Sequence, residues 1–250
     1  MNERQKTALI TGASQGLGAC MARRMAQIGF LVIVNYAHSS KNAEQVVKSI
    51  KDEGFDAVTF QCDISDENAV CEMFKTLDER YGGVDVLVNN ARLDPMSRRP
   101  DETDGMWWDR VLSVGLRGAY LCSNEYYKRA EQHRNGRIVN LSSCRAHRPN
   151  ELSAIAYSTS KLAVHCLTRS YAAALAPYGI TVNTLAPGMI ETENMYKRIG
   201  VSGYEAECKN IPLHRAGSCD EIADGLIWAV QNGFMTGETI NINGGQTYAP

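Results

Sequence analysis

Seven short apolar runs alternate with longer amphipathic runs along almost the whole chain. The apolar runs are rich in Val, Ile, Leu and Thr, and most are apolar enough to be covered on both faces of a sheet. The stretches between them have ten or more residues with helical patterning, and several end at glycine. This order predicts right-handed crossovers and a parallel sheet with helices on both faces. The predicted strands are 7–11, 31–35, 57–62, 84–90, 136–143, 180–187 and 238–243.

The size and composition of the chain suit one such sheet. Its 250 residues can bury one large core, and 44% hydrophobic with 22% charged residues excludes a disordered body. No internal repeat or linker interrupts the alternation. We therefore expect a single domain over residues 1–250 with a Rossmann-like, doubly wound α/β fold. Asp66 and either Ser39 or Ser40 are the predicted N-caps of two of its helices.

Charge and cysteine usage exclude several classes of function. The 26 basic and 28 acidic side chains give a formal net charge of −2, which argues against a nucleic-acid partner. No apolar run approaches the ~20 residues of a membrane span, and the first residues carry no secretory pattern, so we expect a cytoplasmic protein without a membrane partner. The eight cysteines are widely scattered, which favours reduced, mostly buried thiols over disulfides, and no metal site is expected.

The loop after the first predicted strand is rich in glycine and opens a helix. Backbone N–H groups and the positive end of a helix at such a junction receive a pyrophosphate, and glycine lets the backbone approach it closely. A tight turn without a ligand is the alternative, but the position at the first strand–helix junction favours dinucleotide binding. The expected contacts are Gly12, Ser14, Gln15, Gly16, Leu17 and Gly18.

Tyr157 and Lys161 lie four residues apart on a predicted helix and so share one face. A free tyrosine, with a pKa of ~10, is a poor base at neutral pH, but a neighbouring ammonium favours its phenolate and suits it to general acid–base catalysis. Ser143 ends the fifth predicted strand, where its hydroxyl can donate to a substrate oxygen as charge develops. Such a Tyr–Lys pair is more often structural when it stands alone. Together with Ser143 and the glycine loop, it indicates catalysis.

These motifs resemble the short-chain dehydrogenase/reductase family, in particular its 3-oxoacyl-reductase-like members. The T-G-x-x-x-G-x-G spacing is followed in order by Asn89-Asn90-Ala91, Ser143, Tyr157 with Lys161, Pro187-Gly188 with Ile190 and Thr192, and the tail TGETININGG. The resemblance covers essentially the whole chain. It implies a sheet of order 3-2-1-4-5-6-7, a nicotinamide-dependent oxidoreductase acting on a small carbonyl or alcohol compound, and assembly as a homotetramer or homodimer.

The resemblance also implies individual roles at the site. Lys161 would hold the nicotinamide ribose, Asp63 would contact the adenine, and Ile64 would pack alongside. Tyr157 would exchange the proton while hydride passes between the nicotinamide and the substrate carbon. The remaining cofactor contacts that it implies are Asn90, Ala91, Tyr157, Lys161, Pro187, Gly188, Ile190 and Thr192.

The end of the second strand distinguishes NADP from NAD. A carboxylate there binds the ribose 2′-OH and repels a 2′-phosphate, and this stretch, NYAHSSK, contains none. Asn35, Tyr36 and Ser39 are neutral donors, Lys41 is close, and the run looks like NADP-preferring members of the family, so we expect NADP rather than NAD. Against this, Gln15 stands where many of those members carry Arg. The alternative is that Asn35 and Tyr36 only end the strand.

Two residues depart from the family's pattern. Gly115 stands where an Asn normally completes a proton relay, largely through a water held by its backbone carbonyl. Glycine within a helix costs about 1 kcal/mol relative to Ala, which predicts a kink or a close approach. Arg92 replaces a usual Gly and points either to solvent or toward the substrate. The helical stripe that places Gly115 on a buried face is Trp108, Val111, Leu112, Gly115 and Ala119.

These departures leave rival functions open. One rival is an NADP-binding regulator or sensor with weakened catalysis, and the other is an NAD-dependent sugar or polyol dehydrogenase. Arginines in the loops after the fourth and fifth strands favour an anionic substrate, although a solvated face is the alternative. They are Arg92, Arg98, Arg99, Arg145 and Arg148, and the acidic Glu191, Glu193, Glu205 and Glu207 that follow the sixth strand argue the other way.

Overall fold

The seven predicted strands all form, and they pair in parallel in one sheet of order β3-β2-β1-β4-β5-β6-β7, as expected. The computed structural model describes residues 4–94, 98–148 and 151–248. β1, β4 and β6 are buried along their whole length because helices cover both faces of the sheet. The strands are β1 (Thr7–Ile10), β2 (Leu31–Tyr36), β3 (Ala57–Gln61), β4 (Val86–Asn89), β5 (Arg137–Leu141), β6 (Thr181–Pro187) and β7 (Thr239–Ile242).

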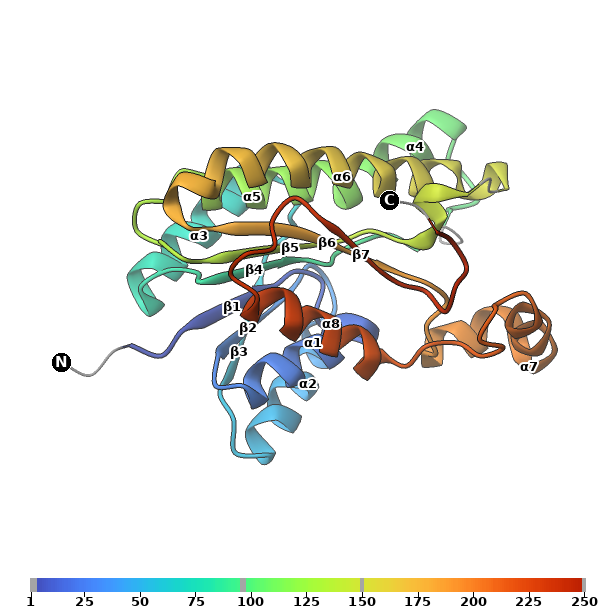
Figure 1. The fold of residues 1–250 in the computed structure, drawn as a ribbon, viewed down its shortest axis with the longest axis horizontal. Helices are drawn as coiled ribbons and strands as arrows, with labels where there is room; N and C mark the ends of the chain where they lie inside the picture. The colour runs from blue at the N-terminus through green and yellow to red at the C-terminus, as the bar shows by residue number, and fades with distance from the viewer. Residues whose placement is uncertain (1–3, 95–97, 149–150, 249–250) are drawn as a thin grey trace.

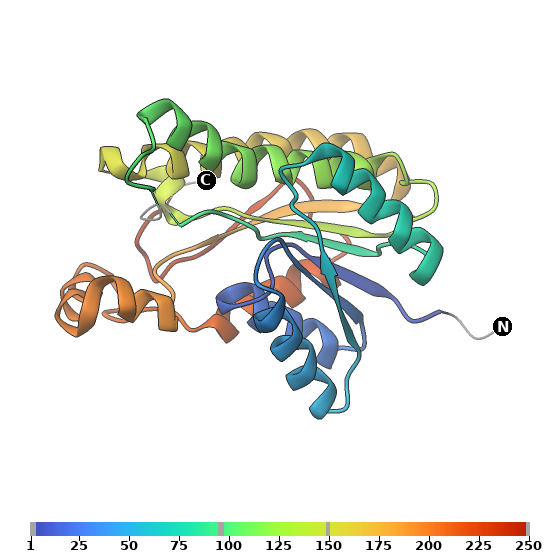
Figure 2. The same cartoon turned by 180° about the vertical axis from the view of Figure 1, so that it is seen from behind.

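Helices form one layer on each face of the sheet (Figures 1 and 2). The apolar faces of α1 (Gly16–Gln27), α2 (Ser40–Asp52) and α8 (Cys219–Gln231) share one core with the sheet. The other core contains α3 (Glu67–Tyr81), α5 (Ala119–Tyr127) and α6 (Ile155–Leu175). None of the described helices is long and apolar enough to cross a membrane. The chain is thus one doubly wound α/β domain.

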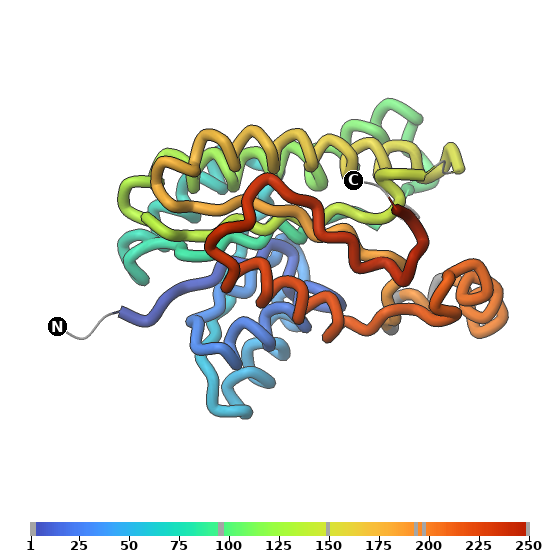
Figure 3. Tube along the Cα trace, in the orientation of Figure 1, coloured from blue at the N-terminus to red at the C-terminus, as the bar shows by residue number. Residues whose placement is uncertain are grey.

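Two further helices lie at the end of the sheet where the strands finish. α4 (Asp104–Leu112) packs on the start of α6, and α7 (Glu193–Lys209) projects from the body of the molecule (Figure 1). The chain returns to this end after β7, as the tube in Figure 3 shows, and Gln246 accepts a hydrogen bond of 2.7 Å from the Met189 N–H through its Oε1. The loops after β6 and β7 are therefore joined.

The predicted helix ends are confirmed in one case and only partly in another. The Asp66 carboxylate caps α3 by accepting from the Ala69 N–H at 3.0 Å, and Gly82 closes the same helix with a φ of 73°. Ser39 occupies the N-cap position of α2, but its side chain makes no capping hydrogen bond. Its hydroxyl is thus not committed to the helix.

The stripe predicted around Gly115 is wrong at its first residue. Trp107 is 6% exposed and packs in the core, whereas Trp108 is 36% exposed. The buried face of α4 runs through Trp107 and Val111, one turn apart, and packs on Ala156 of α6, which leaves Trp108 outside it. A π-helical turn over Ser113–Gly118 then joins α4 to α5. Gly115 itself is buried, as predicted.

The cysteines are less buried than the sequence suggests. All eight thiols are free, and only Cys62, Cys122, Cys144 and Cys208 are buried. Cys71 and Cys166 are exposed, and the remaining two, Cys20 and Cys219, are half-buried.

Candidate active site

One cleft of about 840 Å³ lies where the strands end, and it collects every predicted catalytic and cofactor-binding residue. In a doubly wound sheet, the carboxyl ends of the strands and the point of reversed strand order form the usual ligand site. Here the strand order reverses between β1 and β4. The predicted residues that line the cleft are Gly12, Ser14, Gln15, Gly16, Leu17, Gly18, Asn35, Tyr36, Ser39, Asp63, Ile64, Asn90, Ala91, Ser143, Tyr157, Lys161, Pro187, Gly188, Ile190 and Thr192.

The glycine loop has the geometry of an anion site. Gly12 and Gly16 adopt positive φ angles of 62° and 55°, which side chains disfavour. Gln15, at the N-cap of α1, makes no side-chain capping hydrogen bond, so it leaves the first N–H groups of the helix for a ligand. A Cβ placed on Gly16 would meet no atom within 4 Å, which means that this side of the loop is open. These features fit a dinucleotide pyrophosphate.

Asn90 holds this loop in place rather than facing a ligand with its amide. Its Nδ2 donates to the carbonyls of Thr11 and Gly12 at 2.9 and 3.1 Å. The Thr11 hydroxyl in turn accepts from the N–H groups of Asn90 and Ala91, both at 3.0 Å. A Cβ on Gly18 would lie 2.6 Å from Asn90 Nδ2, so close packing requires glycine there. The end of β4 thus positions the loop after β1.

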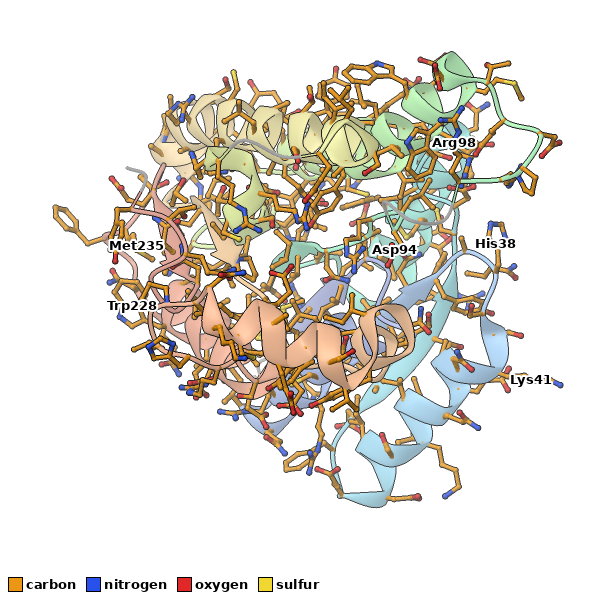
Figure 4. The ribbon with its side chains drawn as sticks, turned by 90° about the vertical axis from the view of Figure 1, so that its right-hand side faces the viewer. His38, Lys41, Asp94, Arg98, Trp228 and Met235 are labelled. Carbon is orange, nitrogen blue, oxygen red and sulfur yellow. The ribbon has the colours of Figure 1, made fainter. Side chains whose placement is uncertain are left out.

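The region that distinguishes the two cofactors is only partly as expected. Asn35 is 2% exposed, and its amide bridges the Gly12 N–H at 3.2 Å and the Cys62 carbonyl at 3.0 Å. It therefore supports the loops rather than offering a free donor. Tyr36 and Ser39 line the cleft, whereas Lys41 does not and points outward from α2 in Figure 4.

Asp63, which the sequence assigns to the adenine, lies after β3 and is exposed at the cleft. Its Oδ1 accepts from the Ser65 N–H at 2.9 Å and from the Ser65 hydroxyl at 2.8 Å. These two bonds fix the orientation of the carboxylate. Ile64 beside it is buried and contributes an apolar wall.

Lys161 is the most unusual charge in the cleft. The side chain is 2% exposed, and its Nζ donates to the Leu141 carbonyl at 2.7 Å, so the helix α6 is tied to the end of β5. Burial, together with the positive charge of Arg92, lowers the pKa of Lys161 to about 7. Nζ lies 5.8 Å from the centre of the Tyr157 ring, and Tyr157 is half-buried one turn earlier on α6. The predicted pairing of these two side chains on one face is present.

Ser143 begins the loop after β5. It is 8% exposed, and its hydroxyl accepts from the Arg145 N–H at 3.2 Å while facing the same cleft. The neighbouring Ser142 donates to the Lys161 carbonyl at 2.8 Å and lies 2.6 Å from Nε2 of His165. Burial lowers the pKa of His165 to about 4, so that ring is neutral at neutral pH. This buried network fixes the loop that carries Ser143 against α6.

Arg92 lines the cleft with its guanidinium toward the Tyr157 ring, and its side chain also remains exposed to solvent. Its guanidinium carbon lies 5.9 Å from the centre of the Tyr157 ring, and Nη1 is 3.8 Å from the Asp94 carboxylate. Arg145 and Arg148 also line the cleft, and Arg145 pairs with Glu151 at 3.0 Å.

Arg98 and Arg99 do not line the cleft. Arg98 lies 2.7 Å from the Asp104 carboxylate and stands apart from Asp94 in Figure 4. Of the acidic side chains after β6, Glu207 lines the cleft, whereas Glu191 accepts from the Tyr196 hydroxyl at 2.7 Å.

Gly115 shows the predicted close approach. A Cβ at this position would lie 3.1 Å from Ser160 Oγ, and that hydroxyl donates to the Tyr157 carbonyl at 2.6 Å. The π-helical turn is therefore packed closely against Ser160 of α6, and position 115 has little room for a side chain.

Several cleft residues escape sequence reasoning. Met195 and Ile199 reach it from α7, and Gln246 reaches it from the C-terminal tail. His38 also lines the cleft, and its position directly before Ser39 is a signal that could have identified it. The others carry no local signal, because only the tertiary fold brings their segments to the cleft.

Comparisons with known proteins agree with this geometry. A family model described as short chain dehydrogenase matches residues 6–199. A 3-oxoacyl-acyl-carrier-protein reductase of Staphylococcus aureus is 37% identical over 244 residues, covering 96% of this chain and 97% of the relative. Glucose 1-dehydrogenase 2 of Bacillus subtilis is 31% identical over 248 residues, covering 98% and 96% of the two chains.

A solved structure has the same fold. The short-chain dehydrogenase/reductase from Serratia marcescens superimposes with a TM-score of 0.87 at 30% identity, covering 97% of this chain and 98% of that one. The glycine loop, the cleft and the Ser–Tyr–Lys group thus occur in a chain that matches this family over nearly its full length. The chain belongs to the short-chain dehydrogenase/reductase family and is a nicotinamide-dependent oxidoreductase.

Proposed function

We propose that this protein transfers hydride between NADP and a carbonyl or secondary alcohol of a small molecule, with Tyr157 as the general acid and base. The observation that carries the proposal is the presence of Ser143, Tyr157 and Lys161 in the same cleft as the uncapped N-terminus of α1. The bound nicotinamide supplies or accepts the hydride. The chain's own residues bind, orient and move the proton.

Each of the three side chains has a distinct part in the proposed reaction. In reduction, the Tyr157 hydroxyl gives its proton to the substrate oxygen as hydride reaches the carbon, and in oxidation the phenolate takes the proton back. The Ser143 hydroxyl donates to the same oxygen and stabilises its developing charge. Lys161, when protonated, favours the phenolate and holds the ribose hydroxyls. Its pKa of about 7 keeps both protonation states accessible near neutral pH.

The preference for NADP rests on the surroundings of the loop after β2. Tyr36, His38 and Ser39 line the cleft and present no carboxylate to a 2′-phosphate. The Ser39 hydroxyl makes no hydrogen bond that caps α2, so it can bind a ligand.

Replacing Ser39 tests this preference cleanly. Asp is as good a helix N-cap as Ser, so Ser39→Asp should fold normally while placing a carboxylate near the 2′ position. We expect kcat/KM with NADPH to fall at least tenfold and kcat/KM with NADH to hold or rise. Ser39→Asn, which is nearly isosteric and neutral, is the matched control. Equal effects of the Asp variant on both cofactors would contradict NADP preference.

An anionic substrate is the finer proposal for the reacting end. Arg92 and Arg148 line the cleft near Tyr157 and Ser143, and guanidinium groups bind carboxylate, sulfonate or phosphate in bidentate fashion. Comparing kcat/KM for matched charged and neutral ketones in wild type, Arg92→Ala and Arg148→Ala measures this directly. A charged-substrate preference that both variants leave unchanged, or no such preference at all, would refute it.

A second candidate is oxidation of a sugar or polyol with NAD. It is favoured by the glucose 1-dehydrogenase relative and by the acidic Glu207 in the cleft, which suits a neutral polyhydroxy compound better than an anion. Screening both cofactors against aldoses, polyols and ketones separates the two proposals.

We also propose that the protein assembles as a homotetramer or homodimer. Phe234 is 99% exposed and Trp228 is 51% exposed on the edge formed by α8 and β7, and Figure 4 shows Trp228 and the nearby Met235 at the margin of the molecule. Large apolar side chains of this kind favour burial against another copy. Light scattering of the purified protein, with Phe234→Ser as the test variant, measures the assembly state.

A further inference from the structure

One side chain from the segment after β7 crosses to the loops that follow β5 and β6. Gln246 Oε1 accepts hydrogen bonds from the Met189 N–H at 2.7 Å and from the Cys144 thiol at 3.9 Å. Met189 directly follows Gly188 at the end of β6, and Cys144 directly follows Ser143 at the end of β5. The amide of Gln246 therefore joins the two loops that carry these site residues.

The backbone around Gln246 is held by a turn that Asn243 organises. Asn243 is 9% exposed, and its Oδ1 accepts from the Gly245 N–H at 3.0 Å while its Nδ2 donates to the Thr247 hydroxyl at 2.9 Å. Its carbonyl accepts from the Gln246 N–H at 3.1 Å. A Cβ on Gly188 would lie 2.4 Å from Gln246 Oε1, so glycine at 188 leaves space for the amide. The position of the amide is thus fixed by the fold before any ligand arrives.

The two ends of the Gln246 amide have different surroundings. Its Oε1 faces the protein, where it accepts both hydrogen bonds. Its Nε2 donates to none of the residues that the structure describes, and the half-buried side chain lines the cleft. The nitrogen of a primary amide carries two N–H donors and accepts nothing. Gln246 therefore offers the cleft two donors that await an acceptor.

The place of Gln246 in the cleft favours the substrate over the dinucleotide as that acceptor. The glycine loop, Asn35 and Asp63 follow β1, β2 and β3, which form one half of the sheet. Gln246 contacts the loops after β5 and β6, in the other half, where Ser143 lies. We assign the reacting oxygen of the substrate to Ser143, so a donor beside the Ser143 loop is placed for another oxygen of the same molecule.

We propose that Gln246 is a specificity-determining residue whose Nε2 donates to a second oxygen of the substrate, one that belongs to a carboxylate, ester or amide group. This inference rests on the proposed hydride transfer to a carbonyl compound. A donor nitrogen selects an acceptor oxygen over a methylene group at the same place. Because hydrogen bonds contribute more when the acceptor is charged, a keto acid should gain more than its ester.

The test compares three matched ketones that carry a carboxylate, a methyl ester or an alkyl group at the same distance from the ketone. Wild type should show a kcat/KM about tenfold or more higher for the keto acid than for the alkyl ketone, and about threefold higher for the ester. Gln246→Glu retains an acceptor for the Met189 N–H but replaces the donors with an anion. The preference for the keto acid should then fall about tenfold or more through KM, while kcat for the alkyl ketone and the dissociation constant of the dinucleotide stay within about twofold.

A neutral variant and a charge control complete the comparison. Gln246→Met removes the donors without adding charge, and the ratio of kcat/KM for keto acid to alkyl ketone should fall about threefold or more. Any disturbance of the loop after β6 affects all three ketones alike and cancels in that ratio. Gln231→Glu, at the exposed end of α8, adds the same charge away from the cleft and should leave the ratio unchanged.

A ratio that neither Gln246 variant changes, or a wild type with no preference for a second oxygen, would overturn the inference. Equal losses for all three ketones together with weaker dinucleotide binding would also overturn it, because the amide would then contact the nicotinamide carboxamide. A wild type that turns over no ketone or alcohol with either dinucleotide would contradict the proposed function itself. Calorimetric binding of the keto acid and the alkyl ketone to wild type and both Gln246 variants measures the preference without turnover.

Discussion

The half of the cleft built from β1, β2 and β4 differs from the half built around α6 in how its polar groups are paired. In the first half, the amides of Asn35 and Asn90 and the hydroxyl of Thr11 are all engaged in holding backbone of neighbouring loops. In the second half, Lys161 is buried against a carbonyl, and the described residues place no carboxylate within ion-pair distance of it.

This difference separates binding from chemistry. A dinucleotide site works by rigid placement of backbone N–H groups, so its polar side chains are satisfied internally before any ligand arrives. A site for proton transfer needs groups whose protonation can change near the working pH, and an unpaired, buried ammonium provides one at a cost in stability. The two halves should therefore respond in opposite ways to mutation.

Removing the buried charge should give the largest effect, and it should be stabilising. The pKa of Lys161 is about 7 in the folded chain and 10.5 ordinarily, so between these values the unfolded chain holds a proton that the folded chain lacks. The penalty is complete below about pH 7 and vanishes above about pH 10.5. Lys161→Met should raise the free energy of unfolding by about 4 kcal/mol at neutral pH, with the gain shrinking as pH rises.

Urea denaturation across this pH range measures the gain. Lys75→Met, at an exposed position on α3, is the control and should change little. A Lys161 variant that is less stable than wild type at neutral pH would mean that the hydrogen bond to Leu141 outweighs the burial of the charge.

In the cofactor half of the cleft, a methyl group added at Gly18 should lower both the stability of the fold and the affinity for dinucleotide. Gly18→Ala places a Cβ 2.6 Å from Asn90 Nδ2 and 2.7 Å from the Gly12 carbonyl oxygen, where the loop cannot yield. Overpacking of this kind costs about 1–3 kcal/mol, so we expect a lower melting temperature and dinucleotide affinity reduced about tenfold. Gly105→Ala in α4, where a Cβ meets nothing within 4 Å, should be neutral or slightly stabilising. Equal behaviour of the two variants would show that the loop is not rigid.

The smallest effect on turnover is expected at Gly115, where the π-helical turn packs against α6. Gly115→Asn brings a Cβ to 3.1 Å from Ser160 Oγ, which Ser160→Ala would relieve. If only the backbone carbonyl at 115 matters, the double variant should fold and change turnover by less than about fivefold, upward. A large gain would instead mark the natural chain as catalytically impaired and strengthen the sensor hypothesis. Loss of folding in both variants would place the obstruction elsewhere in the turn.

The fold and most of the residues that line the cleft could be predicted from the sequence, for physical reasons. The hydrophobic pattern of a buried strand differs in period from that of an amphipathic helix. The alternation of the two patterns along the chain therefore predicts a parallel sheet. Gly12 and Gly18 stand where a Cβ would clash, and Gly12 and Gly16 adopt positive φ angles that side chains disfavour, so the loop requires glycine for local reasons. The residues after each strand then share one edge of the sheet because the strands are parallel.

What escaped sequence analysis depends on contacts between distant segments. The internal roles of Asn35 and Asn90 depend on carbonyls from other loops. The π-helical turn depends on a change of hydrogen-bond register that side-chain periodicity does not encode. Trp108 was misassigned because only the packing of α4 on α6 shows that its neighbour Trp107 is the buried one. The direction of Arg92 depends on the Tyr157 ring, which lies on a helix far along the chain.

The most direct test of the central claim is the turnover and dinucleotide affinity of Tyr157→Phe. Only the hydroxyl is lost, so the cofactor half should be untouched and the dissociation constant for the dinucleotide should match that of wild type. Turnover should fall ~10²–10⁴-fold, the usual contribution of a general acid–base group. Unchanged turnover in a variant that still binds dinucleotide would contradict the assignment of Tyr157, and with it the division of the cleft into a binding half and a reacting half.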